Sequence, residues 1–180
     1  TWSSESNLGS SSLSFDGSND RVKVYDDSES VGDFTLAAWV KISSGEGGAV
    51  TDNYDGNYPQ AKLRVHNGDF GRSVGAVRLR LHDNSGDDEL VVDTSETVDD
   101  GAWHHITGIR RQDTIKDYID GVEKAQASNS ALSTDLRQGE RHWGARPDGD
   151  SGEYFGGLIE DARAYDRALS QPEIKSLAHL

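Results

Sequence analysis

The chain has 180 residues, a net charge of −14 at pH 7 and no cysteine, and these properties exclude several kinds of protein. Without cysteine there is no disulfide framework, no thiol catalysis and no cysteine-bound zinc, and an acidic chain is a poor partner for nucleic acid or an anionic membrane surface. No apolar run is long enough for membrane insertion as a helix, and the absence of a signal-peptide pattern is compatible with a mature, an excised or a cytosolic chain.

Alternation of apolar and polar residues predicts an all-β chain, with turns at Asp-Gly and Ser-Gly pairs. The expected strands, in chain order, are 13–16, 22–25, 34–42, 62–66, 77–82, 89–93, 103–111, 114–120, 141–144 and 154–165. Residues 34–42 are apolar on both faces, which indicates a central strand covered on both sides.

Only the C-terminal end has a helical pattern. Ser170 and Glu173 form a capping box with Pro172 in the first turn, which predicts about two turns of helix packed on the sandwich. At the other end, the Ser-rich residues 1–7 are expected to be frayed.

The acidic composition, with 32 acidic against 18 basic residues, has two interpretations. Proteins of high-salt environments carry such acidic surfaces, because salt screens their self-repulsion. Plain solubility explains the same composition equally well, so a halophilic origin and a simple solubility role both stay open.

Five segments are informative through their order along the chain. They are 13–20, 33–41, 103–106, 118–121 and a closing group at 157–165, 167–170 and 173–174. Together they resemble the laminin-G-like domain, a concanavalin A-like jelly roll, over residues 13–177. The resemblance implies a two-sheet antiparallel jelly-roll sandwich with a short C-terminal helix, as a single domain over 1–180 with its core at about 8–178.

The family resemblance also implies a setting and a class of partner. Its members are usually modules of larger extracellular proteins that bind carbohydrates or proteins, often with a structural calcium. We therefore expect an extracellular or cell-surface piece of a larger secreted protein whose partner is a polysaccharide or glycan. Hydrolases and lyases of polysaccharides share the fold, so the fold alone does not assign chemistry.

The resemblance places a calcium ion on the convex side, where the first strand meets the last. The matching acids are Asp16, Glu160 and Asp161, and the family usually has Asp where Glu160 stands. Calcium takes six to eight oxygen ligands, and only one of two adjacent strand residues can face it. The alternative is that these acids are solvated or pair with Arg163.

Two predicted strands each carry three basic or titratable residues on one face. These are Lys62, Arg64 and His66 on the first strand and Arg78, Arg80 and His82 on the second. Antiparallel pairing would place them side by side, and on a concave sheet their guanidinium groups would suit the carboxylates or sulfates of an acidic polysaccharide. The alternative is pairing with local acids such as Asp83, Asp87 and Asp88.

Sugar sites also use flat aromatic rings, which stack on the apolar face of a sugar. The candidates in or beside loops are Tyr54, Tyr58, Trp143 and Tyr154. With the basic residues they complete the predicted ligand-binding set.

No catalytic motif is visible in the sequence. The Glu-x-Asp-x-Glu pattern of laminarinase-like hydrolases is absent, and no catalytic residue is assigned. The sequence predicts a non-catalytic carbohydrate-binding module, for an acidic polysaccharide, with a structural calcium. The alternatives are a polysaccharide lyase with His66 or His82 as base, a hydrolase of the same fold, and a protein-binding adhesion module.

Overall fold

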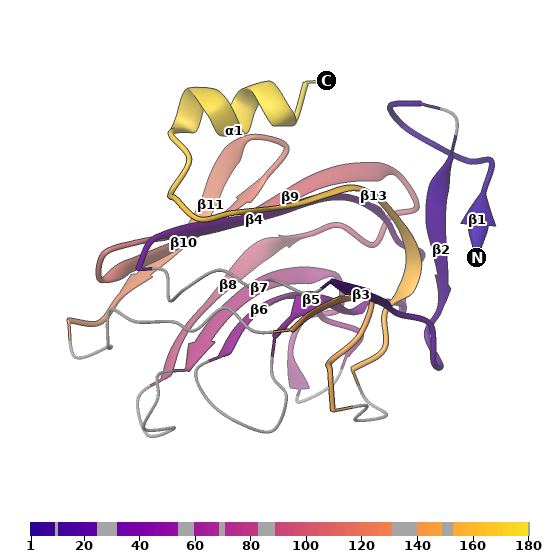
Figure 1. The fold of residues 1–180 in the computed structure, drawn as a ribbon, viewed down its shortest axis with the longest axis horizontal. Coiled ribbons are helices and arrows are strands. Elements are labelled where there is room, and N and C mark those ends of the chain that lie inside the picture. The colour runs from indigo at the N-terminus through magenta and orange to yellow at the C-terminus, as the bar shows by residue number, and fades with distance from the viewer. Residues whose placement is uncertain are drawn as a thin grey trace.

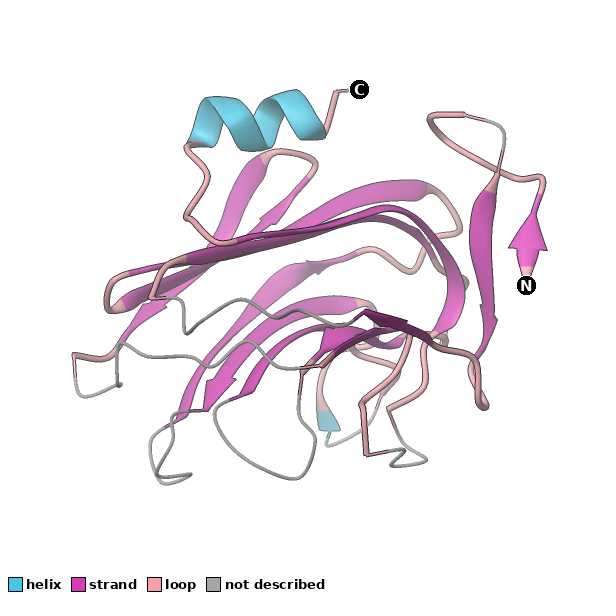
Figure 2. Cartoon of the chain, in the orientation of Figure 1, coloured by secondary structure: helices cyan, strands magenta, loops and turns pink. Residues whose placement is uncertain are grey.

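The structure, a computed structural model, describes residues 1–9, 11–24, 32–53, 60–68, 71–82, 89–130, 140–148 and 153–179. Within these ranges two antiparallel sheets pack face to face and one helix covers part of the outside (Figures 1 and 2). This architecture confirms the predicted jelly-roll sandwich.

One sheet has seven strands and the other has six. The seven-stranded sheet has the order β1 (Trp2–Ser3), β2 (Ser12–Asp16), β13 (Gly156–Tyr165), β4 (Phe34–Lys41), β9 (Trp103–Arg111), β10 (Thr114–Ile119) and β11 (Val122–Ser128). The six-stranded sheet has the order β3 (Val22–Val24), β12 (Arg141–Trp143), β5 (Gly48–Asp52), β6 (Gln60–Val65), β7 (Ala76–His82) and β8 (Glu89–Thr97).

The core fills the space between the two sheets. Alternate residues of β6 and β7, such as Leu63 and Leu79, point inward and are fully buried. Strand β4 lies near the middle of its sheet and is buried along almost its whole length, as predicted. Its inner residues, including Leu36, join this core, whereas Ala37 belongs to a second apolar cluster on the outer face.

Helix α1 (Gln171–Leu177) covers that second cluster on the outer side of the seven-stranded sheet (Figure 1). The Glu173 carboxylate accepts a hydrogen bond from the Ser170 backbone N–H at 2.7 Å, so the predicted capping box is present. Ile174 and Leu177 bury their side chains against the sheet, which fixes the helix on this face. Within the described residues, no helix has the length and apolar character needed to cross a membrane.

The N-terminal residues are ordered by hydrogen bonds and are not frayed. Trp2 and Ser3 pair with β2 as an edge strand. The Glu160 carboxylate accepts hydrogen bonds from the Ser6 hydroxyl at 2.7 Å and from the Asn7 backbone N–H at 2.6 Å. The expectation of fraying was wrong because this long-range carboxylate anchors a segment that has no apolar pattern of its own.

Two strands, β5 and β11, were also missing from the sequence prediction. Strand β5 is buried on both faces and β11 is exposed along much of its length. Neither therefore shows the alternation that identifies a half-buried strand.

Candidate ligand-binding site

The basic residues of β6 and β7 lie side by side on the outer face of the six-stranded sheet. Lys62 is the register partner of Arg80, and Arg64 is the register partner of Arg78. Because the residues between them point into the core, alternation turns these four cations away from it. The predicted neighbour relation of the two strands is confirmed.

A cavity of about 410 Å³ opens on this face. Its volume lies in the range of about 300–1,000 Å³ that is common for ligand pockets. Six cationic side chains line it together with Val91 and two acids; the cations are Lys62, Arg64, Arg72, Arg78, Arg80 and Arg146, and the acids are Glu89 and Glu153. The wall is therefore rich in cations, although the chain as a whole is acidic.

The deepest part of the cavity holds two cations that are almost fully buried. The Lys62 side chain is 1 % exposed and the Arg64 side chain 3 %. Lys62 Nζ lies 2.8 Å from Glu153 Oε1, and Arg64 Nη1 lies 3.5 Å from Glu153 Oε2. Asp52, which is held by two hydrogen bonds from Gln60, lies 3.5 Å from Lys62 Nζ. Buried charges need such partners, since an unpaired ion in the protein interior costs several kcal/mol.

Asp93 on β8 fixes a second group of cations. Arg78 donates to it from Nε at 2.6 Å and from Nη2 at 2.8 Å, and Arg72 Nη1 lies 3.4 Å away. His66 Nε2 lies 3.1 Å from the same carboxylate. Burial by itself raises the pKa of Asp93, but the hydrogen bonds from Arg78 and His66 outweigh it and hold the pKa below its ordinary value. Asp93 therefore stays ionised and orients the Arg78 guanidinium.

The rim cations are paired as well. Arg80 donates to Glu89 and contacts His82, and Arg146 Nη2 lies 2.8 Å from Asp148. Asp93 and Asp148 pair with lining cations but do not line the cavity themselves. A ligand would thus meet guanidinium groups that are paired with carboxylates, and two of these carboxylates, Glu89 and Glu153, line the cavity as well.

The alternative pairing proposed from sequence involves Asp83, Asp87 and Asp88, which lie outside the described residues. Of the partners that the structure does describe, Glu89 is such a local acid and pairs with Arg80, whereas Asp93 and Glu153 come from other parts of the chain. The basic face is therefore an ion-pair network as well as a basic surface.

Several predicted ligand-binding residues lie elsewhere. His66 and His82 are buried, and neither lines the cavity. They contact charged residues beside it, His66 with Asp93 and His82 with Arg80. Trp143, a predicted ligand-binding ring beside a loop, packs in the core instead. The short strand β12 is buried on both faces and gives no alternation that would have shown this. Tyr154 is half-buried and does not line the cavity. Tyr54 and Tyr58 lie outside the described residues.

Sequence reasoning missed five lining residues: Glu89 and Val91 on β8, and Arg72, Arg146 and Glu153 in loops. The last three belong to no strand, so period-two alternation could not identify them. A charged side chain in a loop was the only feature that could have marked these residues as part of the site. The chain has 50 acidic and basic residues, so a charge by itself does not distinguish a site residue from any other.

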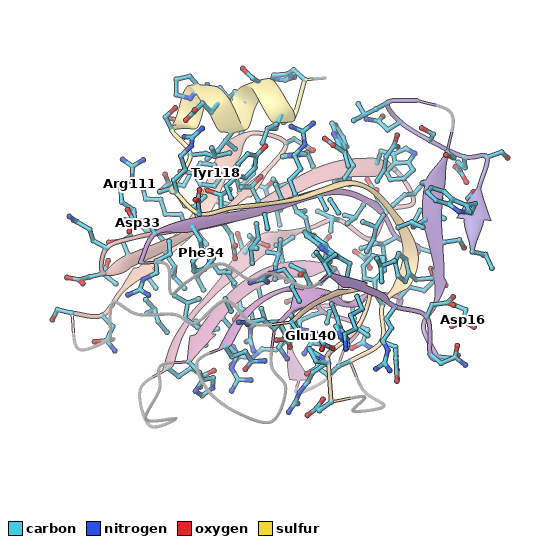
Figure 3. All side chains as sticks on the ribbon, viewed as in Figure 1. Asp16, Asp33, Phe34, Arg111, Tyr118 and Glu140 are labelled. Carbon is cyan, nitrogen blue, oxygen red and sulfur yellow. The ribbon has the colours of Figure 1, made fainter. Side chains whose placement is uncertain are left out.

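The three predicted calcium ligands do not form one site. Asp16 is the exposed last residue of β2 (Figure 3), and its carboxylate accepts hydrogen bonds from the Ser18 and Asn19 backbone N–H groups in the turn that follows. Its register partner on β13 is Gly156, and Glu160 lies four residues further along, about 13 Å away at the rise of a strand.

The other two acids have partners of their own. Glu160 binds the N-terminal segment, and Asp161, at a bulge with φ of 48°, pairs with Arg163 at 2.8 Å. Among the described residues, no three acidic or histidine side chains are placed to hold a metal ion. This ligand set does not fit calcium, and calcium binding by the chain stays a prediction from the family.

The sequence matches a known family over most of its length. Residues 16–175 match the sequence model of the concanavalin A-like lectin/glucanases superfamily, so the chain belongs to that superfamily. A comparison with curated proteins finds no match.

Solved structures with the same fold include domains of very different proteins. A heptameric SAP-like pentraxin of Limulus polyphemus is 17% identical, with a TM-score of 0.70 over 92% of this chain and 80% of that one. The LG4-5 domains of the mouse laminin α1 chain are 14% identical, with a TM-score of 0.68 over 88% of this chain and 43% of that one. The CBM40 module of a Ruminococcus gnavus IT-sialidase, solved with α2,3-sialyllactose, is 16% identical, with a TM-score of 0.64 over 89% and 97%.

At these identities the likeness establishes the fold. The chain spans less than half the length of the laminin fragment and of the toxin binding domains that it also resembles. Several of these structures are binding domains.

Proposed function

We propose that the chain is a non-catalytic carbohydrate-binding module that takes an acidic glycan on the outer face of its six-stranded sheet. The observation that carries this proposal is the cavity with six cationic and two acidic lining side chains in a protein of net charge −14. The six cations form a local reversal of the chain's charge, stabilised by paired carboxylates. Recognition of carboxylate or sulfate groups would give this reversal a role.

The arrangement of the cations supports anion recognition. Arg78 is fixed by two hydrogen bonds to Asp93, and Lys62 and Arg64 are locked against Glu153. Side chains that are already ordered lose little conformational entropy when a ligand binds.

The overall negative charge repels an acidic polymer at long range, whereas the cavity attracts it at contact. Added salt weakens both interactions. The affinity should therefore fall less steeply with salt than it does for a protein whose whole surface is basic.

The comparisons supply a precedent for the ligand class. A module of this fold is solved with α2,3-sialyllactose, and the receptor-binding domain of botulinum neurotoxin D has the same fold. We propose an extracellular setting, as part of a larger secreted protein, on the same family grounds.

Binding is better supported than elimination chemistry. A lyase needs a base at the wall of its cleft, but the candidate bases His66 and His82 are not among the residues that line the cavity. Incubation with polygalacturonate and alginate, followed by the ultraviolet absorbance of unsaturated products, tests this choice. Steady product formation would replace the binding proposal with a lyase.

The direct test removes two rim cations. Arg72 and Arg80 lie at the cavity rim, and Arg72 is 53 % exposed, so the double variant Arg72→Ala with Arg80→Ala should fold normally. Losing two charge-assisted contacts should weaken binding about tenfold or more. The measurement is affinity electrophoresis on polygalacturonate, alginate and chondroitin sulfate, with dextran as the neutral polymer.

The matched control is Arg167→Ala. This arginine is 54 % exposed and pairs with Glu173 beside α1, far from the cavity residues. It should leave retention on the acidic polymers unchanged. Equal retention of the double variant and the parent protein on every acidic polymer would refute the proposal.

A further inference from the structure

A second cavity lies on the other side of the sandwich. It has a volume of about 500 Å³ and lies between the outer surfaces of β9, β10 and β11 and the chain that enters α1. Figure 3 shows two of its residues, Arg111 and Tyr118, on the same side of the seven-stranded sheet as the helix. The whole sandwich therefore separates this cavity from the basic one.

The floor of this second cavity is apolar and uncharged. Ile109, Leu169 and the Tyr118 ring are buried and belong to the cluster beneath α1. Burial and the nearby Glu123 charge raise the pKa of Tyr118 to about 12, so its hydroxyl stays protonated and donates to Glu123 at 3.3 Å. The floor is a surface on which an apolar ligand face can rest.

Five polar side chains around this floor are exposed, and one of them is Glu123. Within the described part of the chain, the other four make no side-chain hydrogen bond or ion pair; they are Arg111, Gln112, Gln126 and Gln171. Neighbouring Lys116, in contrast, is already paired with Glu123 at 2.9 Å.

The three glutamines decide the chemistry of the rim. Each carboxamide offers two N–H donors and one carbonyl acceptor, and a sugar hydroxyl needs both a donor and an acceptor. Arg111 adds further donors for ring or hydroxyl oxygens. Because Lys116 is balanced by Glu123, Arg111 is the one uncompensated charge among the described lining residues of this cavity. Two cations line it in all, against six in the basic cavity.

We propose that this cavity is a second carbohydrate site, which takes one or two uncharged sugar residues. The apolar face of a sugar ring would rest on Ile109 and Leu169, and its hydroxyls would exchange hydrogen bonds with the amides of Gln126 and Gln171. The site does not depend on binding at the basic cavity. Because the two cavities lie on opposite faces, one copy of the chain would hold two glycan segments at once.

The test reads the glutamine side chains directly. The ¹⁵N-labelled protein is titrated with cellobiose, maltose, lactose and N,N′-diacetylchitobiose, and the side-chain NH₂ resonances are followed. We expect saturable shifts of the Gln126 and Gln171 resonances with at least one disaccharide. Gln126→Ala, read at Gln171, and Gln171→Ala, read at Gln126, should each weaken the affinity about threefold to tenfold.

The control is the rim variant of the basic cavity, Arg72→Ala with Arg80→Ala, which should leave these shifts unchanged. The proposal is overturned if none of the four disaccharides shifts the two amides, or if the affinities survive both glutamine substitutions. It is also overturned if the shifts occur only around the basic cavity. Acidic polymers that fail to bind while the amides shift would refute the proposed function and leave the second site standing.

Discussion

Replacing Glu153 by Gln should destabilise the protein markedly, because this carboxylate balances two buried cations. Lys62 Nζ lies 2.8 Å and Arg64 Nη1 3.5 Å from its two oxygens. Removing one partner of a buried ion pair typically costs about 3–5 kcal/mol. Lys62 also lies near Asp52 and Gln keeps the shape of the side chain, so we expect the lower end, about 3 kcal/mol.

This free energy converts into a shift of the melting temperature. Unfolding entropy near the melting point is about 2.1 cal/mol/K per residue, which for 180 residues gives about 380 cal/mol/K. A loss of about 3 kcal/mol then lowers Tm by about 8 °C. Calorimetry at pH 7, supported by urea unfolding, measures both quantities.

A double variant separates charge imbalance from lost packing. The double variant Lys62→Met with Glu153→Gln removes one buried charge of each sign. Its loss of unfolding free energy should therefore be smaller than the sum of the losses of the two single variants, by at least about 1 kcal/mol. Glu5→Gln is the control, because Glu5 is an exposed partner of Lys41. An exposed pair contributes less than about 1 kcal/mol, which corresponds to less than about 3 °C.

The reasoning about Glu153 is refuted by either of two results. One is a Glu153→Gln melting temperature within about 2 °C of the parent protein, which is the size expected for an exposed residue. The other is strict additivity of the Lys62 and Glu153 substitutions, since side chains that interact must couple.

Three further predictions concern protons and calcium. Burial raises the pKa of the Asp117 carboxyl, so the folded protein favours its protonated form and stability is lost as the pH rises above about 4. Asp117→Asn keeps an acceptor for the Leu79 N–H and should therefore raise Tm at pH 7 more than at pH 3.5. An equal change of Tm at both pH values would contradict this prediction. Burial lowers the pKa of His105 to about 4, so up to about 3 kcal/mol of stability is lost as the pH falls from 6.5 to 4. In urea unfolding experiments, the stability of His105→Gln should fall less over this pH range than that of the parent protein. An equal fall in both proteins would exclude His105 as the cause. If calcium binds the chain, added calcium raises Tm relative to added chelator. Because Asp16 lies far from Glu160 in the strand register, Asp16→Asn should leave this rise in Tm unchanged. A variant that no longer shows the rise would contradict the conclusion that Asp16 lies outside a calcium site.

Local pattern was sufficient to predict the basic face. Alternation in residues 62–66 and 77–82 assigns Arg64 and Arg78 to one side of their strands and Leu63 and Leu79 to the other, and the register of β6 with β7 places the two arginines opposite each other. The same rule identified β4 as a buried central strand. The capping box at Ser170 and Glu173 located α1. Each of these inferences uses residues within about twenty positions of one another.

Contacts between distant parts of the chain were beyond that kind of reasoning. Glu153 reaches Lys62 from 91 positions away, and Glu160 orders Asn7 from 153 positions away. Trp143 was a candidate ligand-binding residue because it flanks a loop in the sequence, and the structure buries it in the core.

The chain's pattern of alternating side chains specifies the two sheets, because the pleat turns successive residues to opposite faces regardless of what lies across from them. The pattern does not specify which acid neutralises which cation, since a carboxylate can pair with any cation that the folded chain brings within about 4 Å. The basic cavity, the second cavity beside α1 and the dispersed positions of Asp16, Glu160 and Asp161 all follow from that three-dimensional arrangement.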